Sequence, residues 1–328
     1  MKKSIVTGGA GFIGSHLVDL LIEHNHEVVI IDNLASGNLK NIEHLKNTKS
    51  VCLIESDINN IESNNKDIQN ADFVFHLAGL GDIVPSIENP TKYFYANYFG
   101  TLNLLEALKD IDIKKFVYAA SSSCYGIADI PTNENNKIDP KYPYALSKYQ
   151  AEQLIFHWHK VYGLKANSIR IFNAYGTRSR TTGAYGAVIG TFLKQKLSDH
   201  PFTVVGDGNQ RRDFIYVTDL AKAFLKAAEI EDIEGEVFNV GNSNPRSINE
   251  LVSLLQGEVI FIPKRPGEPE ITHADITKAK NLLNWQPEIS LEDGIKLVLK
   301  EIEYWQEAPL WTPEKIEIET QSWFKYLS

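Results

Sequence analysis

Two side chains that could transfer a proton stand four residues apart in this sequence, Tyr144 and Lys148. In a helix this spacing places both side chains on one face. A free tyrosine has a pKa of about 10 and is a poor base near neutrality. A neighbouring ammonium group favours the phenolate and lowers that pKa. The pair therefore predicts a general base with a charged partner.

An accidental helix pair is the alternative interpretation of these two residues, and the spacing alone would favour it. Two neighbouring features favour a catalytic role instead. Pro143 directly precedes the tyrosine, and proline suits the first turn of a helix. Three serines, Ser121, Ser122 and Ser123, follow a strand-like apolar run. Together these features indicate a functional site.

A second motif, T-G-G-A-G-F-I-G, carries Gly8, Gly11 and Gly14 directly after an apolar run. The first glycine allows a tight turn, the second lets the backbone approach a pyrophosphate, and the third lets a helix pack close to a sheet. A helix that begins near Phe12 would offer its free N–H groups and positive dipole end to phosphates. The strand–turn–helix context makes this a predicted dinucleotide site.

Asp32 follows the second apolar run, eighteen residues after Gly14. A carboxylate there can accept hydrogen bonds from the adenosine ribose and repels a 2′-phosphate, so it selects NAD over NADP. The alternative, a surface turn residue, fits this placement less well. Asp57, after the third run, could accept a hydrogen bond from the adenine amino group, although a plain turn aspartate fits nearly as well.

The elements that must position these residues alternate between short apolar runs and helical patterns. Such alternation predicts an α/β fold: a doubly wound Rossmann parallel sheet with a smaller mixed α/β C-terminal substrate domain. Helices are expected at Phe12–His24, Pro90–Lys109, Tyr144–Tyr162 and Thr218–Ala228. The predicted strands are Ser4–Thr7, Glu27–Ile31, Val51–Ile54, Phe73–His76, Phe116–Ala119, Ala166–Phe172 and Glu236–Val240.

Two domains are expected from the way these patterns are interrupted. A loop-rich excursion begins after Asn173, and the segments after Gly241 are short and mixed. We assign residues 1–173 plus 213–240 to a nucleotide-binding domain and residues 174–212 plus 241–328 to the substrate domain. Near the end of the chain, tryptophans recur at helix-like intervals: Trp305, Trp311 and Trp323. They predict that this tail packs against another surface, either over the active site or on a partner subunit.

The composition excludes several classes of protein. The formal net charge of −9 argues against a nucleic-acid partner. Two cysteines are too few for a disulfide framework, and the histidines lack the spacing of a zinc site, so no metal is expected. No run approaches the roughly 20 apolar residues of a membrane span, and no signal peptide is evident. We therefore expect a cytoplasmic protein without a membrane partner.

The motifs taken together resemble extended short-chain dehydrogenase/reductases, in particular the NAD-dependent epimerase/dehydratase family and its nucleotide-sugar 4-epimerases of the UDP-N-acetylglucosamine type. The resemblance covers nearly the whole chain. The matching segments, in order, are T-G-G-A-G-F-I-G (7–14), H-L-A (76–78), S-S-S-C-Y-G (121–126), P-Y-A-L-S-K (143–148), R-I-F-N-A-Y-G (170–176), G-D-G-N-Q-R-R-D-F-I-Y-V (206–217), R-P-G-E (265–268) and A-D-I-T-K-A (274–279).

The resemblance implies roles for individual residues. Tyr144 is the general base, Lys148 orients and charges it, and Ser121 shares the proton of the sugar 4-hydroxyl. The substrate-binding residues are Ser122, Ser123, Asn173, Arg212, Arg265 and Thr272. Arginine suits the diphosphate because its planar fork can bond two oxygens at once. The cofactor-binding residues, including the glycine turn and both aspartates, are Gly8, Gly11, Phe12, Ile13, Gly14, Asp32, Asn33, Asp57, Ile58, Leu77, Ala78, Asn97, Tyr144 and Lys148.

The resemblance also narrows the reaction. The 4,6-dehydratases of the family carry two acids where this chain has Ser122 and Ser123, and the decarboxylases keep a glutamate at the place of Ser123. Without those acids, the simplest complete cycle reduces a rotated 4-keto sugar from its other face. The expected enzyme is therefore an NAD-dependent 4-epimerase, an isomerase that acts on a nucleotide-diphosphate sugar and serves polysaccharide biosynthesis.

The sugar itself is indicated by two features. In the family a small residue at Thr272 leaves space for a 2-N-acetyl group, and the segment Gly183–Ile189 resembles N-acetylhexosamine 4-epimerases. These features favour a UDP-hexose or UDP-N-acetylhexosamine. Asp82, in a loop expected to face the sugar, departs from the pattern and could signal another hexose or an additional base.

Three other expectations concern alternatives and assembly. A nucleotide-sugar 4-dehydrogenase, or another epimerase or dehydratase of the family, remains the second choice. A catalytically silent NAD-binding protein ranks below it, because Tyr144 and Lys148 are both present. Apolar stripes on the helices at Pro90–Lys109 and Tyr144–Tyr162 predict a homodimer through a four-helix interface, as the family resemblance implies.

Overall fold

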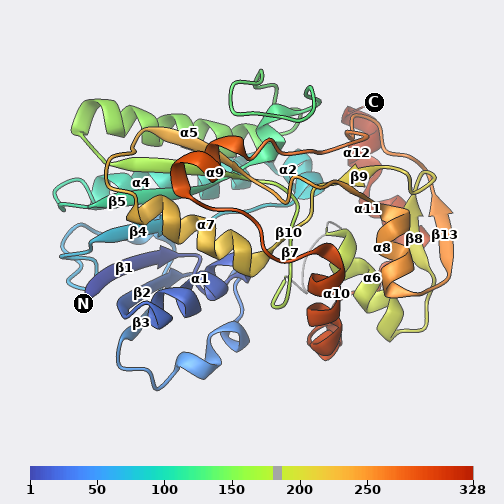
Figure 1. Ribbon diagram of the computed structural model, residues 1–328, viewed down its shortest axis with the longest axis horizontal. Coiled ribbons are helices and arrows are strands. Elements are labelled where there is room, and N and C mark those ends of the chain that lie inside the picture. Colours follow the sequence, from blue (N-terminus) through green and yellow to red (C-terminus); the bar gives the residue numbers. More distant parts are fainter. Residues whose placement is uncertain (180–186, 328) are drawn as a thin grey trace.

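A computed structural model of the chain, which describes residues 1–179 and 187–327, contains a central sheet of seven parallel strands (Figure 1). The strand order is β11-β6-β5-β4-β1-β2-β3. The strands are β1 (Lys2–Thr7), β2 (His26–Asp32), β3 (Val51–Glu55), β4 (Phe73–His76), β5 (Lys115–Ser121), β6 (Ala166–Ile171) and β11 (Glu236–Val240). All seven predicted strands are present, so the doubly wound Rossmann fold is confirmed.

Helices cover both faces of this sheet, which explains why its strands are apolar throughout. Successive side chains of β2 alternate between the two layers: Val28 and Ile30 pack on one side, and Val29 and Ile31 on the other. The first layer contains α1 (Phe12–Glu23), α7 (Val217–Glu229) and α9 (Thr277–Leu283). The second contains α4 (Gly100–Ala107) and α5 (Pro143–Tyr162).

The helix predicted at Pro90–Lys109 is built in three parts. It begins as α3 (Pro90–Phe94), passes through the π-helical turn η4 (Tyr95–Phe99) and continues as α4. A π-helical turn inserts an extra residue into the helical ladder and often lies at a functional site. Here it carries Asn97, whose side chain is buried.

A second group of elements lies at one end of the sheet (Figure 1). Its core joins Phe192, Phe202, Leu251 and Trp305, which are all buried. Its elements are β7 (Ala174–Tyr175), α6 (Val188–Leu197), β8 (Phe202–Val205), β9 (Arg211–Arg212), β10 (Ile215–Tyr216), β12 (Arg246–Ser247), α8 (Ile248–Leu255), β13 (Val259–Ile262), α10 (Leu291–Lys300) and η6 (Ile302–Trp305). The short strands pair β7 with β10, β8 with β13 and β9 with β12.

One segment that the sequence analysis assigned to the substrate domain packs elsewhere. Ala274, Ala279 and Trp285 belong to the hydrophobic cluster of the sheet, together with α1 and α7. The indole N–H of Trp285 donates to the carbonyl of Asp219 on α7, at 2.9 Å. The core of the sheet therefore recruits residues from both sequence-assigned domains.

The chain ends in two short helices, α11 (Pro313–Glu319) and α12 (Gln321–Tyr326). Trp305 is buried in the second core and Trp323 is buried on α12. Thus the tail packs on its own chain, with α12 against α2 (Ile83–Glu88). Short helical turns complete the described structure: η1 (Leu39–Asn41), η2 (Glu43–Leu45), η3 (Ile58–Asn60) and η5 (Ser122–Tyr125). Over residues 1–179 and 187–327, no helix has the length and apolar character needed to cross a bilayer.

Candidate active site

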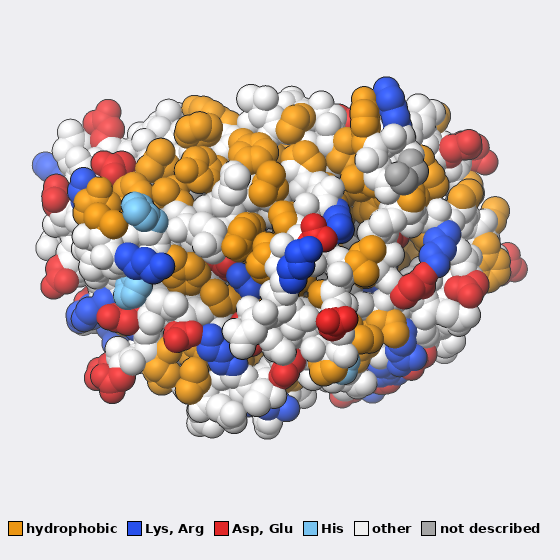
Figure 2. Space-filling view, turned by 90° about the horizontal axis from the view of Figure 1, so that it is seen from above, with side chains coloured by type: hydrophobic (Ala, Val, Ile, Leu, Met, Phe, Trp, Pro, Cys, Tyr) orange, Lys and Arg blue, Asp and Glu red, His pale blue; other side chains and the backbone are white. Residues whose placement is uncertain are grey.

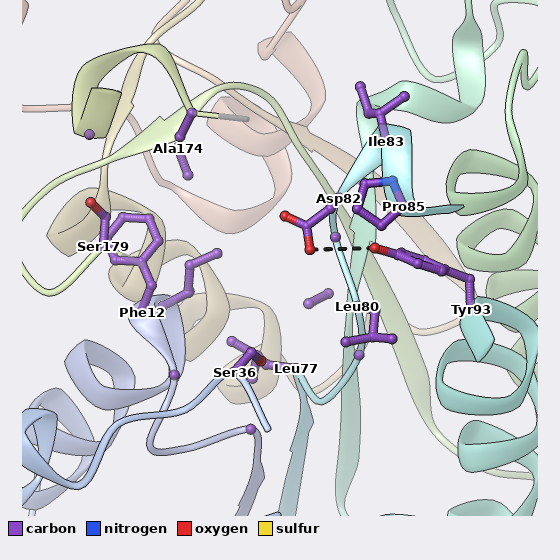
Figure 3. A pocket seen from close by; sticks show the side chains of 18 of the residues that line it. Phe12, Ser36, Leu77, Leu80, Asp82, Ile83, Pro85, Tyr93, Ala174 and Ser179 are labelled. Carbon is purple, nitrogen blue, oxygen red and sulfur yellow. Dashed lines mark hydrogen bonds between the residues drawn. The ribbon is translucent and has the colours of Figure 1, made fainter. Parts of the chain in front are cut away.

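A cavity of about 1060 Å³ opens where the carboxyl ends of β1, β2 and β4 meet the second group of elements. In doubly wound sheets, ligands bind at this edge, where the strand order reverses. Figure 3 shows Phe12, Leu77, Leu80 and Ala174 around the hollow. The sequence-predicted site residues that line it are Gly8, Gly11, Phe12, Ile13, Gly14, Asp32, Asn33, Asp57, Ile58, Leu77, Ala78, Asn173, Arg212 and Arg265.

The glycine turn between β1 and α1 is as tight as the motif predicts. Gly8 has a φ of 70°, and a Cβ there would lie 2.8 Å from the backbone nitrogen of Ala78. A Cβ on Gly14 would lie 2.1 Å from the carbonyl oxygen of Gly8. Neither position can hold a side chain without moving backbone. The bare backbone leaves the N-terminal end of α1 open to the cavity, as a phosphate site requires.

Asp32 ends β2 beside this turn, and its side chain is 6% exposed. One carboxylate oxygen accepts the N–H of Ala10 at 2.9 Å, and the other accepts the N–H of Leu34 at 2.8 Å. Burial raises the pKa of Asp32, while these two hydrogen bonds lower it. A Cβ on Gly37 would lie 2.7 Å from a carboxylate oxygen. The carboxylate is therefore fixed in place at the rim where a ribose would lie.

Asn33 and Asp57 lie next to each other on the same part of the rim. The amide of Asn33 donates to the carboxylate of Asp57 at 2.8 Å. The other oxygen of Asp57 accepts the backbone N–H of Asn59 at 2.9 Å and so caps η3. Burial would raise the pKa of Asp57, but these hydrogen bonds lower it below its usual value. Asp57 thus stabilises the start of η3 in addition to lining the cavity.

Ser121, Tyr144 and Lys148 come together from two elements. Ser121 is the last residue of β5, and the other two lie in the first two turns of α5. The Ser121 side chain lies near enough to the Tyr144 hydroxyl to lower its pKa. Ser121 also accepts the N–H of Ser123 at 3.2 Å and caps η5. None of the three is among the described residues that line the cavity. Lys148 lies just behind its wall, since a Cβ on the lining residue Gly79 would be 3.7 Å from the Lys148 ammonium.

The pKa values of Tyr144 and Lys148 differ from the sequence-based expectation. Burial chiefly raises the pKa of Tyr144, against the lowering effect of Ser121. Burial also lowers the pKa of Lys148 to about 7, against the opposing effect of Glu152. The Lys148 ammonium lies over the Tyr118 ring, 4.2 Å from its centroid. Because a low-dielectric surrounding penalises every charged form, the protein alone does not produce the expected lowering of the tyrosine pKa.

Asn97 has a different position from the one expected of a cofactor ligand. It is 1% exposed and is not among the described residues that line the cavity. Its oxygen accepts the N–H of Leu80 at 2.8 Å, and its nitrogen donates to the carbonyl of Leu80 at 3.1 Å and to the hydroxyl of Ser147 at 2.9 Å. Asn97 therefore ties the loop after β4 to α5, and its role in cofactor binding stays a prediction.

The opposite end of the cavity carries two arginines that share one carboxylate. Arg212 donates to Glu268 at 2.7 Å and to the carbonyl of Pro269 at 2.9 Å. Arg265 lies 3.5 Å from the other oxygen of Glu268. Burial would raise the pKa of Glu268, but the two guanidinium groups hold it below its usual value. The pair presents a net positive charge to the cavity, which suits a diphosphate.

Asn173 and Thr272 are brought into contact, but only Asn173 lines the cavity. The hydroxyl of Thr272 donates to the side-chain oxygen of Asn173 at 2.7 Å and accepts the N–H of Asp213 at 3.1 Å. Thr272, Ser122 and Ser123 are not among the described residues that line the cavity. The effect of Thr272 on the size of the sugar pocket stays a prediction. Residues 183–186 of the segment Gly183–Ile189 lie outside the described residues.

Several residues that matter to this site escaped the sequence reasoning. Tyr118 faces Lys148, and Glu268 holds both arginines. Glu152 follows Lys148 by one helical turn, and its spacing could have marked it as a counter-charge. Asp82, by contrast, was expected in a loop that faces the sugar; it points into the cavity in Figure 3 and accepts the hydroxyl of Tyr93 at 3.4 Å. No group of three or more metal-ligating side chains occurs within residues 1–179 and 187–327.

The fold and the site together define a short-chain dehydrogenase/reductase: a glycine-lined nucleotide cleft with a Ser-Tyr-Lys group at its side. A model of the "NAD dependent epimerase/dehydratase family" matches residues 4–241. The chain belongs to this family.

Three comparisons with characterised or named proteins agree with that assignment. A putative UDP-glucose 4-epimerase of Methanocaldococcus jannaschii is 40% identical over 303 residues, which cover 90% of this chain and 96% of that protein. The UDP-N-acetylglucosamine 4-epimerase of Methanobrevibacter ruminantium, solved with UDP-N-acetylmuramic acid, superposes with a TM-score of 0.85 at 34% identity, over 92% of this chain and 99% of that one. The UDP-glucuronic acid 4-epimerase of Bacillus cereus, solved with UDP-glucuronic acid and NAD, gives 0.86 at 34% identity, over 93% and 99%.

Proposed function

We propose that this protein is an NAD-dependent 4-epimerase of nucleotide-diphosphate sugars. The observation that carries the proposal is the arrangement of one cavity, with a glycine turn at one end, paired arginines at the other, and the group of Ser121, Tyr144 and Lys148, whose lysine lies just behind the wall. The named relatives described above, all UDP-sugar 4-epimerases, support the same reaction.

The residues present fit NAD. Gly8 and Gly14 leave a cradle that a Cβ would fill. Asp32 brings a fixed carboxylate to the rim, which suits a free ribose hydroxyl and opposes a 2′-phosphate. When bound, NAD⁺ supplies a reversible two-electron oxidation of the sugar carbon and a positive pyridinium ring. Such a charge beside Tyr144 would offset the burial that raises the pKa of this residue.

In this mechanism the chain's own residues handle the proton. The phenolate of Tyr144 removes the proton of the 4-hydroxyl, and Ser121 beside it holds the sugar oxygen. The hydride of C4 would pass to bound NAD and return to the opposite face of the turned 4-keto sugar, while Tyr144 gives its proton back to the C4 oxygen. Arg212 and Arg265 hold the diphosphate throughout, so only the sugar rotates.

The side chains next to Ser121 favour epimerisation over elimination. Loss of water from the sugar requires an acid to protonate the leaving hydroxyl. Ser122 and Ser123 lie in η5, directly after Ser121, and neither hydroxyl is acidic enough to protonate a leaving group. The substrate class that follows is a UDP-hexose or UDP-N-acetylhexosamine, whose 4-keto form is reduced again before release. Such a product would serve polysaccharide biosynthesis.

We assign NAD to residues 1–173 plus 213–240 and the sugar nucleotide to residues 174–212 plus 241–328. We also propose a homodimer of cytoplasmic location. Exposed apolar side chains on η4 and α5, among them Phe99, Val161 and Tyr162, support the dimer. Figure 2, which looks onto the α5 side of the molecule, shows hydrophobic side chains spread across this face. Two cysteines without a disulfide suit a reducing compartment.

The decisive experiment incubates the purified protein with UDP-, GDP-, CDP- and dTDP-sugars and follows the configuration at C4 by NMR. We expect interconversion of a C4 epimer pair with no net change in NADH absorbance. Accumulation of a 4-keto sugar together with NADH would identify a 4-dehydrogenase instead. Absence of any change across the panel would contradict the proposed function.

The Tyr144→Phe variant tests the role of the base. We expect it to lower turnover about 10³-fold, within the range typical of a lost general base. The affinities for NAD and UDP, measured by calorimetry, should stay within about twofold of the parent values. In this scheme the phenol hydroxyl transfers a proton and does not bind either ligand. Undiminished turnover would remove Tyr144 from that role.

A further inference from the structure

The last helix of the chain reaches the substrate end of the cavity. Trp323 of α12 lines the cavity and is 4% exposed. Its indole N–H donates to the carbonyl of Pro266 at 2.7 Å. The guanidinium of the neighbouring Arg265 lies 5.4 Å from the centroid of the indole ring, within the range of a cation–π contact. The tail thus holds one of the two arginines proposed to grip the diphosphate.

The other side of the same indole faces the catalytic helix. The rings of Trp323 and Tyr142 have centroids 6.3 Å apart and are inclined at 45°. Tyr142 in turn stacks on Tyr144, with centroids 6.2 Å apart and planes at 9°. Tyr142 directly precedes α5 and is its N-cap residue. One indole therefore contacts Arg265 and the tyrosine that packs on the general base.

A third contact fixes the tail to the opposite wall. The hydroxyl of Ser322 donates to the carboxylate of Glu88, at 2.9 Å. Glu88 ends α2, which begins directly after the loop that carries Gly79 and Asp82. Glu88, Glu319 and Trp323 all line the cavity. Figure 1 shows α2 and α12 next to each other. The end of the chain therefore joins two walls of the site that come from distant parts of the sequence.

We propose that Trp323 is a positioning residue for the reaction, which holds Arg265 and the Tyr142–Tyr144 stack at a fixed separation. The proposal rests on the proposed function, since it assigns the diphosphate to Arg265 and proton transfer to Tyr144. A diphosphate held at one end delivers the sugar 4-hydroxyl to the base only if this separation is kept. Trp323 acts through these two residues.

Packing alone does not account for this tryptophan. Among the described residues, the three hydrophobic cores do not include Trp323, whereas Trp305 belongs to the second core. Its polar and aromatic contacts are directed to residues of the site. Removal of its side chain should therefore leave the cores intact and alter the reaction.

The test compares Trp323→Ala, Trp323→Phe and the control Phe324→Ala, which truncates a 38%-exposed ring on the same helix. For Trp323→Ala we expect KM for the UDP-sugar to rise and kcat to fall, each about tenfold, because a cation–π contact and an aromatic contact are lost. Trp323→Phe keeps a ring and loses the Pro266 hydrogen bond, so its changes should be about threefold. The control should match the parent protein within about twofold.

Two further measurements separate positioning from folding and from the proposed function. Far-UV circular dichroism and the midpoint of thermal unfolding report whether each variant folds, and Trp323→Phe keeps the test valid if Trp323→Ala does not. Calorimetry with UDP alone should show binding to Trp323→Ala weakened about fivefold, whatever sugar is the substrate. Kinetic constants and UDP affinities of folded Trp323 variants equal to those of the control would overturn the proposal. A parent protein that binds UDP but converts no sugar would instead contradict the proposed function alone.

Discussion

At the scale of single residues, burial dominates the chemistry of this site. It raises the pKa of Tyr144 and lowers the pKa of Lys148 to about 7. Burial therefore disfavours the charged form of both groups. A positive charge placed beside Tyr144 would favour its phenolate.

The buried lysine has a measurable consequence for stability. Its pKa is below the unfolded value of 10.5, so between about pH 7 and 10.5 the unfolded chain binds more protons than the folded one. The free energy of unfolding must then rise with pH in this window, by about 1.4 kcal/mol per unit at most from this group. We expect urea midpoints to increase from pH 7 to 9, and to increase less in Lys148→Met. Equal slopes in both proteins would mean that Lys148 is charged when folded.

Asp32 permits a test of cofactor choice. Asp32→Asn replaces an oxygen that accepts a backbone N–H with an amide nitrogen, which cannot accept it. It also removes the charge that repels a 2′-phosphate. We expect NAD affinity to fall about tenfold and the preference over NADP to shrink. Calorimetry with both dinucleotides measures this, with Glu55→Gln on the exposed end of β3 as the control. An unchanged preference would show that Asp32 does not select the cofactor.

At the scale of elements, buried hydrogen bonds hold the catalytic elements in place. His76 ends β4 and is fully buried. One ring nitrogen lies 2.7 Å from the hydroxyl of Thr7 on β1, and the other lies 2.8 Å from the hydroxyl of Thr101 on α4. The Thr101 hydroxyl donates to the carbonyl of Asn97. The neutral imidazole therefore links the glycine turn with the π-helical turn that carries Asn97.

This link should fail in acid. Burial, with a smaller effect from Lys148, lowers the pKa of His76 to about 3. Between pH 6.5 and 3 the unfolded chain binds the extra proton, so stability falls as pH decreases through this window. From pH 6.5 to 5 the loss from one such histidine is about 2 kcal/mol. Urea midpoints across this range should fall less steeply in His76→Asn than in the parent. Parallel curves would show that His76 is not a source of acid sensitivity.

The sequence predicted the elements well where the signal is local. Seven apolar runs became the seven strands, and the spacing of Tyr144 and Lys148 placed both at the start of α5. The sequence did not predict contacts between distant segments of the chain. Thr272 donates a hydrogen bond to Asn173 and accepts one from the backbone of Asp213. The Lys148 ammonium lies over the ring of Tyr118. Such contacts depend on tertiary packing, which no spacing rule encodes.

At the scale of the whole molecule, the site is shared among segments far apart in the sequence. Cavity residues come from the glycine turn after β1, from α2, β9 and α12, and the arginine end requires Glu268. The sheet likewise recruits Trp285 from late in the chain. The two sequence-assigned domains are therefore expected to unfold together, since neither keeps a complete core alone.

The proposed dimer is tested at this scale. Phe99 is half exposed on η4, next to α5. If a second copy covers this face, Phe99→Asp places a charge in an apolar interface, which is costly. Sedimentation velocity at micromolar concentration should show a dimer for the parent protein and a monomer for the variant. A monomeric parent protein would contradict the proposed homodimer. It would not contradict the proposed epimerase activity, which the NMR assay tests.

The position of α12 has a practical consequence for work on this enzyme. The two ends of the chain lie far apart in Figure 1, and Met1 is 87% exposed. Tyr326, by contrast, is three residues from an indole in the wall of the cavity. A purification tag at the C-terminal end would follow directly on α12, whose Trp323 lines the cavity, whereas a tag at the N-terminal end would precede β1. Kinetic constants from the two fusions should therefore be compared before either is taken as the native value.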